Sequence, residues 1–128
     1  MKENEIGSII VDCAVELHRN LGPGLLETVY EVTLARALER RGLAVQRQVS
    51  VPIEYQGETF SEGFRADLIV GELVIVELKS LERVTPAHKK QLLTYLRLTG
   101  LKLGYLLNFG EALMRDGITR TINGSIDP

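Results

Sequence analysis

The sequence predicts an α/β fold in which helices cover the faces of a mixed sheet, and three patterns support this fold class. Within residues 5–21, apolar side chains recur at three- and four-residue steps, the period of one face of an α-helix. Within residues 45–55 the period changes to two, which indicates a half-buried strand. Residues 73–79 are β-branched and almost wholly apolar, as expected for a central strand covered on both faces. A sheet of this kind is the expected packing partner for the helices.

The first two helices are expected to form a hairpin. The helix of residues 5–21 ends at Gly22-Pro23-Gly24, because proline cannot continue the hydrogen-bond ladder. A second helix starts near Leu26 and stops at Gly42, and arginines lie toward its end, where the helix dipole favours positive charge.

The remaining elements follow from alternation and from turn residues. Pro52 indicates that the first strand is an edge strand or carries a bulge. Thr85 and Pro86 suit the start of a helix, and Gly100 suits its end. The expected elements are strands at 45–55, 58–70 and 73–79, a helix at 85–99, a strand at 103–108 and a short edge strand at 118–122.

The size and composition are those of one globular domain. At 128 residues the chain has too little length for a second core, so residues 1–128 are expected to form a single domain. Apolar residues make up 45% and charged residues 25%, which is ordinary for a globular protein. No apolar run approaches the roughly 18–20 residues needed to cross a bilayer, and the first residues lack a signal-peptide pattern. We therefore expect a cytoplasmic protein with no membrane partner.

Charge and cysteine content exclude some kinds of site. A net charge of −2 argues against binding nucleic acid through a blanket of positive charge, although clustered carboxylates at a metal site would also lower the total. Cys13 is the only cysteine, so an internal disulfide and a site of several thiolates are excluded. There is no GxGxxG or GxxxxGK loop, hence no nucleotide-cofactor signature.

Charged side chains interrupt the buried strand at 73–79. Glu77 and Lys79 are two residues apart and share a face, and Asp67 lies in the preceding strand. Burying an unpaired carboxylate or ammonium costs on the order of several kcal/mol, so these residues need a reason. One explanation is a Glu77–Lys79 ion pair. The other is a site for Mg²⁺ or Mn²⁺, which prefer carboxylate oxygens, with Lys79 holding a water and offsetting charge on a phosphate.

The register of the hairpin between these strands decides whether a shared site can form. With a two-residue loop, Val70 would face Leu73, and Asp67 and Glu77 would point to opposite faces. A three-residue loop would pair Val70 with Val74 and place Asp67 across from Glu77. A bulge near Asp67 would serve equally well.

Two pairs of helical residues are further candidates. Glu27 and Tyr30 lie three apart near the start of the second helix, and Gln91 and Tyr95 lie four apart in the third, so each pair shares one face. The alternative is that Glu27 is simply favourable capping in a first turn and that Gln91 and Tyr95 are ordinary semi-buried residues.

Histidines and lysines supply weaker candidates. We expect His18 to be packed or to cap a helix and His88 to be solvated, because neither has a catalytic neighbour pattern. His88, Lys89 and Lys90 adjoin Gln91 and could form a phosphate-contacting patch, with a solvated helix face as the alternative.

The residues also resemble a known family. The segment Gly24-Leu25-Leu26-Glu27-Thr28-Val29-Tyr30 matches the motif that names the GxxExxY family. Further likeness includes Arg65-Ala66-Asp67-Leu68, Val76-Glu77-Leu78-Lys79 and Asn108-Phe109-Gly110, and covers nearly the whole chain. That family is placed in the PD-(D/E)XK nuclease superfamily. The resemblance implies a restriction-endonuclease-like α-β-β-β-α-β core, here with an extra N-terminal helix.

Position by position, the resemblance implies roles for the candidates. It makes Asp67 and Glu77 metal ligands, Lys79 the partner of the attacking water, and Glu27 a further acidic ligand. Residues 91–95 resemble the QxxxY element of the exonuclease-like branch, in which Gln91 and Tyr95 would help position the site and the nucleic-acid backbone.

The expected function is metal-dependent hydrolysis of phosphodiester bonds, with DNA favoured over RNA as the substrate. Mg²⁺ or Mn²⁺ is the expected cofactor. Tyr30 is expected beside His88, Lys89 and Lys90 in contact with nucleic acid. Sequence specificity would come from homodimerisation or from a partner protein, because the chain has no evident recognition module. The alternative is a catalytically silent protein that keeps the fold and binds nucleic acid or a partner.

Overall fold

The fold is built on a five-stranded sheet with strand order β1-β2-β3-β4-β5, and the computed structural model describes residues 1–126. The pairs β1–β2, β2–β3 and β4–β5 are antiparallel, whereas β3 and β4 are parallel because the chain crosses over between them through α3. The elements are α1 (Glu3–Leu21), α2 (Glu27–Arg40), β1 (Val45–Tyr55), β2 (Glu58–Val70), β3 (Val74–Lys79), α3 (Pro86–Thr99), β4 (Leu103–Asn108), η1 (Met114–Asp116) and β5 (Ile118–Ile122). The mixed sheet, the element order and the extra N-terminal helix are as the sequence predicts.

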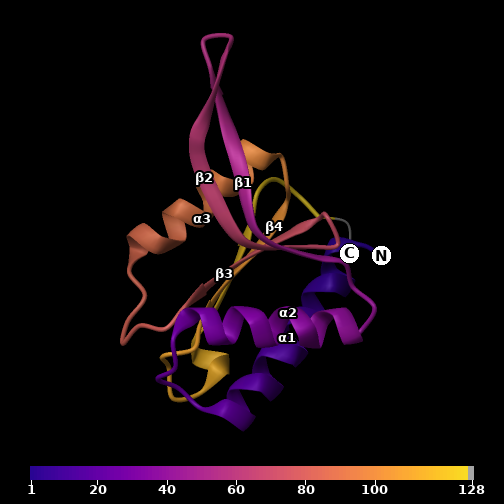
Figure 1. Cartoon of the computed structure of the whole chain (residues 1–128), viewed down its shortest axis with the longest axis vertical. Helices are drawn as coiled ribbons and strands as arrows, with labels where there is room; N and C mark the ends of the chain where they lie inside the picture. Colours follow the sequence, from indigo (N-terminus) through magenta and orange to yellow (C-terminus); the bar gives the residue numbers. More distant parts are fainter. Residues whose placement is uncertain (127–128) are drawn as a thin grey trace.

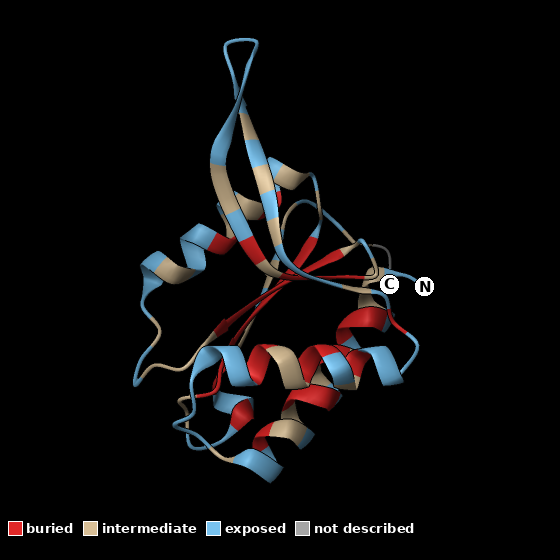
Figure 2. Cartoon of the chain, viewed as in Figure 1, coloured by how far each residue is buried: buried red, intermediate tan, exposed pale blue. Residues whose placement is uncertain are grey.

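Helices cover both faces of this sheet (Figure 1). The α1–α2 hairpin packs on one face, where it buries Ile10, Leu34 and Leu38 against residues of β2, β3 and β4. The single helix α3 packs on the other face through Leu92 and Leu96. The central strands are therefore almost wholly buried, whereas the outer ends of β1 and β2 are exposed (Figure 2).

The hairpin between β2 and β3 has a three-residue loop. Val70 pairs with Val74, and Gly71 and Glu72 both have left-handed backbone, with φ of 59° and 60°. Leu73, expected at the start of the strand, belongs to this loop and donates its N–H to the carbonyl of Val70 at 3.1 Å. The structure thus adopts the register that places Asp67 across from Glu77.

The long β1–β2 ribbon changes the face it turns to the core at one position. Val45 packs against the cluster under α1 and α2, whereas Val49 packs against the cluster under α3, although residues four apart share a face in a regular strand. On β2, Leu68 packs against the cluster under α1 and α2, whereas Ala66, two residues away, packs against the cluster under α3. The change therefore falls between them, at Asp67 and at the residue opposite it on β1. Beyond this point the ribbon extends away from the rest of the sheet (Figure 1).

Turn and cap residues behave as the sequence predicts. The register shift in β1 falls between Val51 and Ile53, at Pro52, and β1 is an edge strand. Gly100 ends α3 in left-handed conformation with φ of 75°, a geometry that glycine adopts at little cost.

Among the described residues, no helix combines the length and the apolar character that a membrane span requires.

Candidate active site

Asp67 and Glu77 form the centre of the candidate site, where the β2–β3 ladder ends. The last backbone pair is Leu68 with Val76. One step further, Glu77 Oε2 accepts a hydrogen bond from the backbone N–H of Asp67 at 2.8 Å, and Asp67 Oδ2 accepts one from the N–H of Leu78 at 2.9 Å. Each carboxylate thus takes the place of a strand carbonyl, and the two acids meet across the strands.

Burial and mutual repulsion make this pair reluctant to carry two negative charges. Glu77 is only 7% exposed, and burial together with the charge of Asp67 raises the pKa of Glu77 to about 8. Burial also raises the pKa of Asp67, and the backbone N–H of Leu78 only partly offsets this. Two close carboxylates with raised pKa values are chemically suited to a divalent cation, which would relieve the repulsion and which binds oxygen ligands.

Lys79 lies near the pair without bonding to either acid. Its positive charge lowers the pKa of both Asp67 and Glu77, yet no ion pair within 4.0 Å joins it to them in residues 1–126. The structure therefore does not support a Glu77–Lys79 ion pair as the reason for these residues. Lys79 is half-buried as a residue, and no ion pair engages its amine among the described residues.

Glu27 is less closely associated with the pair than the sequence predicts. It is exposed in the first turn of α2, and its charge makes the smallest contribution among those that shift the pKa of Asp67. Within residues 1–126, no three His, Cys, Asp or Glu side chains come close enough to hold one ion. The structure brings together Asp67 and Glu77, and a role for Glu27 as third ligand stays a prediction.

A second carboxylate of α2, that of Glu31, is linked to Asp67 through Gln48, and the sequence interpretation missed it. Glu31 is 6% exposed, and Oε2 accepts hydrogen bonds from Arg47 Nε at 3.0 Å and Nη2 at 2.9 Å. Its Oε1 accepts one from Gln48 Nε2, which also lies 3.4 Å from Asp67 Oδ1. Glu31 follows Glu27 by four residues and so shares its side of α2, a signal that the sequence contained.

On the other face, α3 brings one of its two predicted residues to the site. The Tyr95 ring stacks on Phe64 with centroids 3.8 Å apart and planes 5° apart. Burial and the charges of Glu77 and Asp67 raise the pKa of Tyr95, which keeps the phenol protonated and able to donate a hydrogen bond. Gln91 is exposed and forms no side-chain hydrogen bond within residues 1–126.

The basic residues of α3 differ in their environments. The Nδ1 of His88 accepts a hydrogen bond from the N–H of Thr85 at 3.0 Å and so completes the cap of α3, while the residue stays partly exposed. Lys89 and Lys90 are exposed, as a phosphate-contacting patch and a solvated helix face both require.

The nucleic-acid contact expected for Tyr30 is wrong. Its side chain is 0% exposed, its ring stacks on Phe109 at 4.2 Å, and its hydroxyl donates to the carbonyl of Gly22 while accepting from the N–H of Leu25 at 3.1 Å. Because its hydroxyl both donates and accepts a hydrogen bond within the loop before Glu27, Tyr30 stabilises that loop and is not exposed to a nucleic acid.

Asn108 fixes the loop that follows Lys79. Its Oδ1 accepts hydrogen bonds from the N–H groups of Leu81 and Gly110, and its Nδ2 donates to the carbonyl of Leu81 at 3.0 Å. A Cβ on Gly110 would lie 2.0 Å from that carbonyl oxygen, so only glycine permits this approach. The loop that follows Lys79 is therefore held in place by the buried Asn108 side chain.

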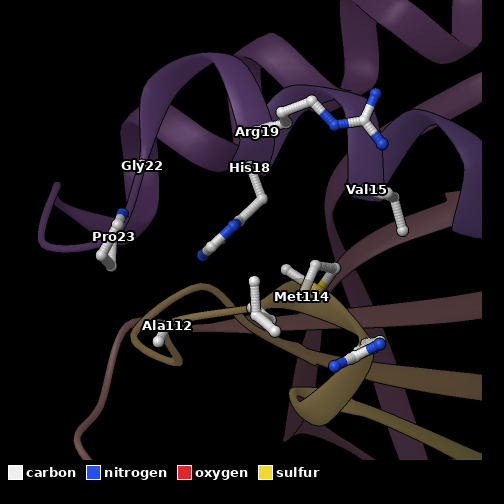
Figure 3. Close-up of a pocket in the computed structure, with 9 residues that line it drawn as sticks. Val15, His18, Arg19, Gly22, Pro23, Ala112 and Met114 are labelled. Atoms are coloured by element: carbon white, nitrogen blue, oxygen red, sulfur yellow. The ribbon is translucent and has the colours of Figure 1, made fainter.

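The two surface hollows described lie away from the carboxylates. One, of about 510 Å³, is lined by His18, Pro23, Ala112 and Met114 among others, and Figure 3 shows the His18 side chain extending from α1 toward the segment that contains Ala112. His18 Nε2 lies 2.8 Å from the carbonyl oxygen of Glu111, which confirms the packed role expected for it. The other hollow lies between α1 and α2, and neither is lined by Asp67, Glu77 or Lys79.

The chain matches a known protein family. A family model described as the PD-(D/E)XK nuclease superfamily matches residues 4–121, a range that contains Asp67, Glu77 and Lys79. No curated protein and no solved structure matches the chain.

The role of Tyr30 predicts a loss of stability on removing one atom. Tyr30→Phe keeps the ring stack but leaves the Gly22 carbonyl and the Leu25 N–H without their partner, so the free energy of unfolding should fall by about 1–3 kcal/mol. Urea titration measures the change. As a control, Tyr55→Phe at the exposed end of β1 should stay within about 0.5 kcal/mol of wild type. Equal effects of the two substitutions would contradict the assigned role.

The raised pKa of Glu77 predicts that stability without metal declines as the pH rises. Between about 4.5 and about 8, the folded chain keeps a proton that the unfolded chain releases, so the free energy of unfolding falls with increasing pH across this window. Glu77→Gln keeps an acceptor for the N–H of Asp67 and should remove most of this decline, which is on the order of a few kcal/mol. Urea titrations in chelator from pH 5 to about pH 9 measure it.

The exposed Glu54→Gln is the matched control for the pH series, and its curve should follow that of wild type. An unchanged decline in Glu77→Gln would show that Glu77 does not cause it.

Proposed function

Because the chain belongs to the PD-(D/E)XK nuclease superfamily, we propose that it is a metal-dependent nuclease whose site consists of Asp67, Glu77 and Lys79. The observation that carries this proposal is the convergence of the Asp67 and Glu77 carboxylates at the end of the β2–β3 ladder. Glu27 is the proposed third acidic ligand, contributed by the first turn of α2. The likeness of residues 24–30 to the GxxExxY motif supports assignment to that subfamily.

The donors present suit Mg²⁺ or Mn²⁺, because the site offers carboxylate oxygens and no thiolate or imidazole. A divalent cation bound there would make a bound water more acidic and stabilise charge on a phosphate. For this the two carboxylates must be ionised, so their raised pKa values couple cation binding to release of a proton.

Other side chains of this chain would then orient the reacting groups. The Lys79 amine, unpaired with either acid, donates to the attacking water and offsets negative charge on the phosphate. The protonated phenol of Tyr95 donates to a phosphate oxygen, and stacking on Phe64 limits its movement. Gln91 lies one turn before Tyr95 on α3 and is proposed to support the nucleic-acid backbone.

DNA is the proposed substrate, ahead of RNA, and α3 is the proposed contact surface. Lys89 and Lys90 are exposed on the helix that also carries Tyr95, so a strand whose phosphate lies at the site could contact both lysines. His88 lies beside them, but its ring also caps α3, which makes it a weaker contact.

Cleavage assays test the proposed activity. Wild-type protein with Mg²⁺ or Mn²⁺ should cleave single- or double-stranded DNA, and Lys79→Ala should lower the rate by at least about 100-fold. Lys102→Ala, an exposed lysine outside the site, should cleave like wild type. Absence of cleavage by wild type on both DNA and RNA would contradict the proposal and favour the silent binding protein.

Binding experiments test the proposed contact surface. Replacing both Lys89 and Lys90 by alanine should weaken DNA binding at every sequence. It should also make the slope of log K against log salt less negative by about 2, because each lost phosphate contact removes about one unit. Fluorescence anisotropy at several salt concentrations measures this slope, with Arg36→Ala on α2 as the control. An unchanged slope would place the contact surface elsewhere.

A further inference from the structure

Gln48 has an unusual backbone for its position in a strand. Its φ is +51°, in the left-handed region that non-glycine residues rarely adopt, and it lies within the long strand β1. The register on either side, Arg47 with Leu68 and Val49 with Ala66, places Gln48 opposite Asp67. This is also where the β1–β2 ribbon changes the face that it turns to the core. Backbone strain of this kind costs on the order of 1–3 kcal/mol and persists only where the surroundings enforce it.

The side chain of Gln48 links two carboxylates. Its Nε2 donates to Glu31 Oε1 and, at the longer distance of 3.4 Å, to Asp67 Oδ1. An amide NH₂ has two protons, so one nitrogen can serve both acceptors. Because the N–H of Leu78 holds Asp67 Oδ2, the carboxylate of Asp67 is contacted at both oxygens.

Glu31 is the anchor of this link and not a ligand. Arg47 holds its Oε2 through two hydrogen bonds and balances its charge, and Gln48 occupies its Oε1. With both oxygens bonded and the side chain buried, Glu31 fixes the position of the Gln48 amide relative to α2.

We propose that Gln48 is a positioning residue, anchored by Glu31, that orients the carboxylate of Asp67 for binding a divalent cation. The inference rests on the proposed function, in which Asp67 is a metal ligand. Partners of ligating groups typically change metal affinity by 10–100-fold when removed. The competing explanation is that the cluster of Glu31, Arg47 and Gln48 only fastens β1 to α2.

Gln48→Gly separates the two explanations, because it removes the amide and relieves the left-handed backbone at once. If Gln48 only fastens the strand, the melting temperature should fall and Mn²⁺ binding at Asp67 should keep its wild-type affinity. If Gln48 positions Asp67, the melting temperature should hold or rise, while Mn²⁺ binding measured by isothermal titration calorimetry weakens by about 10-fold or more.

Gln56→Gly is the matched control. Gln56 has the same φ of 51° but lies in the turn at the far end of the hairpin, so its substitution relieves the same kind of strain without touching the site. Its Mn²⁺ affinity should equal that of wild type. Should Gln48→Gly fail to fold, Gln48→Asn tests the same link, since asparagine tolerates left-handed backbone but is one methylene too short to reach both carboxylates.

Hydrogen exchange gives a readout that needs no metal. In metal-free Gln48→Gly, the amide of Leu78 should exchange about 10-fold faster or more, because Asp67 no longer holds it firmly, while the amide of Val76 in the intact ladder is unchanged.

Mn²⁺ binding by wild type tests the proposed site, and Leu78 exchange tests the positioning role of Gln48 independently of it. A wild-type protein that fails to bind Mn²⁺ would refute the proposed site, and Leu78 exchange would still decide the role of Gln48. The positioning role is overturned if Leu78 exchanges at the wild-type rate in Gln48→Gly, or if a wild type that binds Mn²⁺ loses no affinity on this substitution.

Discussion

The site depends on the exchange of hydrogen bonds between two side chains and two backbone amides where β2 and β3 separate. Glu77 accepts from the N–H of Asp67, and Asp67 accepts from the N–H of Leu78. These bonds satisfy buried backbone groups beyond the last ladder pair, and they also hold two carboxylates close together. Structure and chemistry are therefore coupled, because this placement buries the two carboxylates beside each other, and burial together with their repulsion raises the pKa values that a cation would lower.

Much of the fold could be predicted because its elements follow simple periods. The three-four spacing in α1 and α2, the alternation in β1 and the apolar run of β3 each report directly on burial. Whether Asp67 lies across from Glu77 could not be decided from the sequence, because Gly71 and Glu72 suit a two-residue or a three-residue loop and a bulge near Asp67 was a further alternative. The left-handed φ of Glu72 could not be predicted, because glutamate rarely adopts this conformation and only the folded hairpin imposes it.

The surroundings of the carboxylates were harder to predict because they depend on contacts between distant segments. The three-residue spacing predicted that Tyr30 shares a face of α2 with Glu27. In the structure Tyr30 is buried, because its ring stacks on Phe109 and its hydroxyl bonds the carbonyl of Gly22. Gln48 has a left-handed backbone and its amide bonds Glu31, and a glutamine in an alternating strand predicts neither feature.

In the proposed function, Asp67 and Glu77 hold one divalent cation between them. Diffraction from crystals soaked in Mn²⁺, recorded near the manganese absorption edge, tests it most directly. A bound cation should give an anomalous peak within about 2.0–2.5 Å of an oxygen of each carboxylate, the distance range of hard-cation ligands. A map in which manganese binds elsewhere, or in which the two carboxylates face each other with no ion between them, would contradict it.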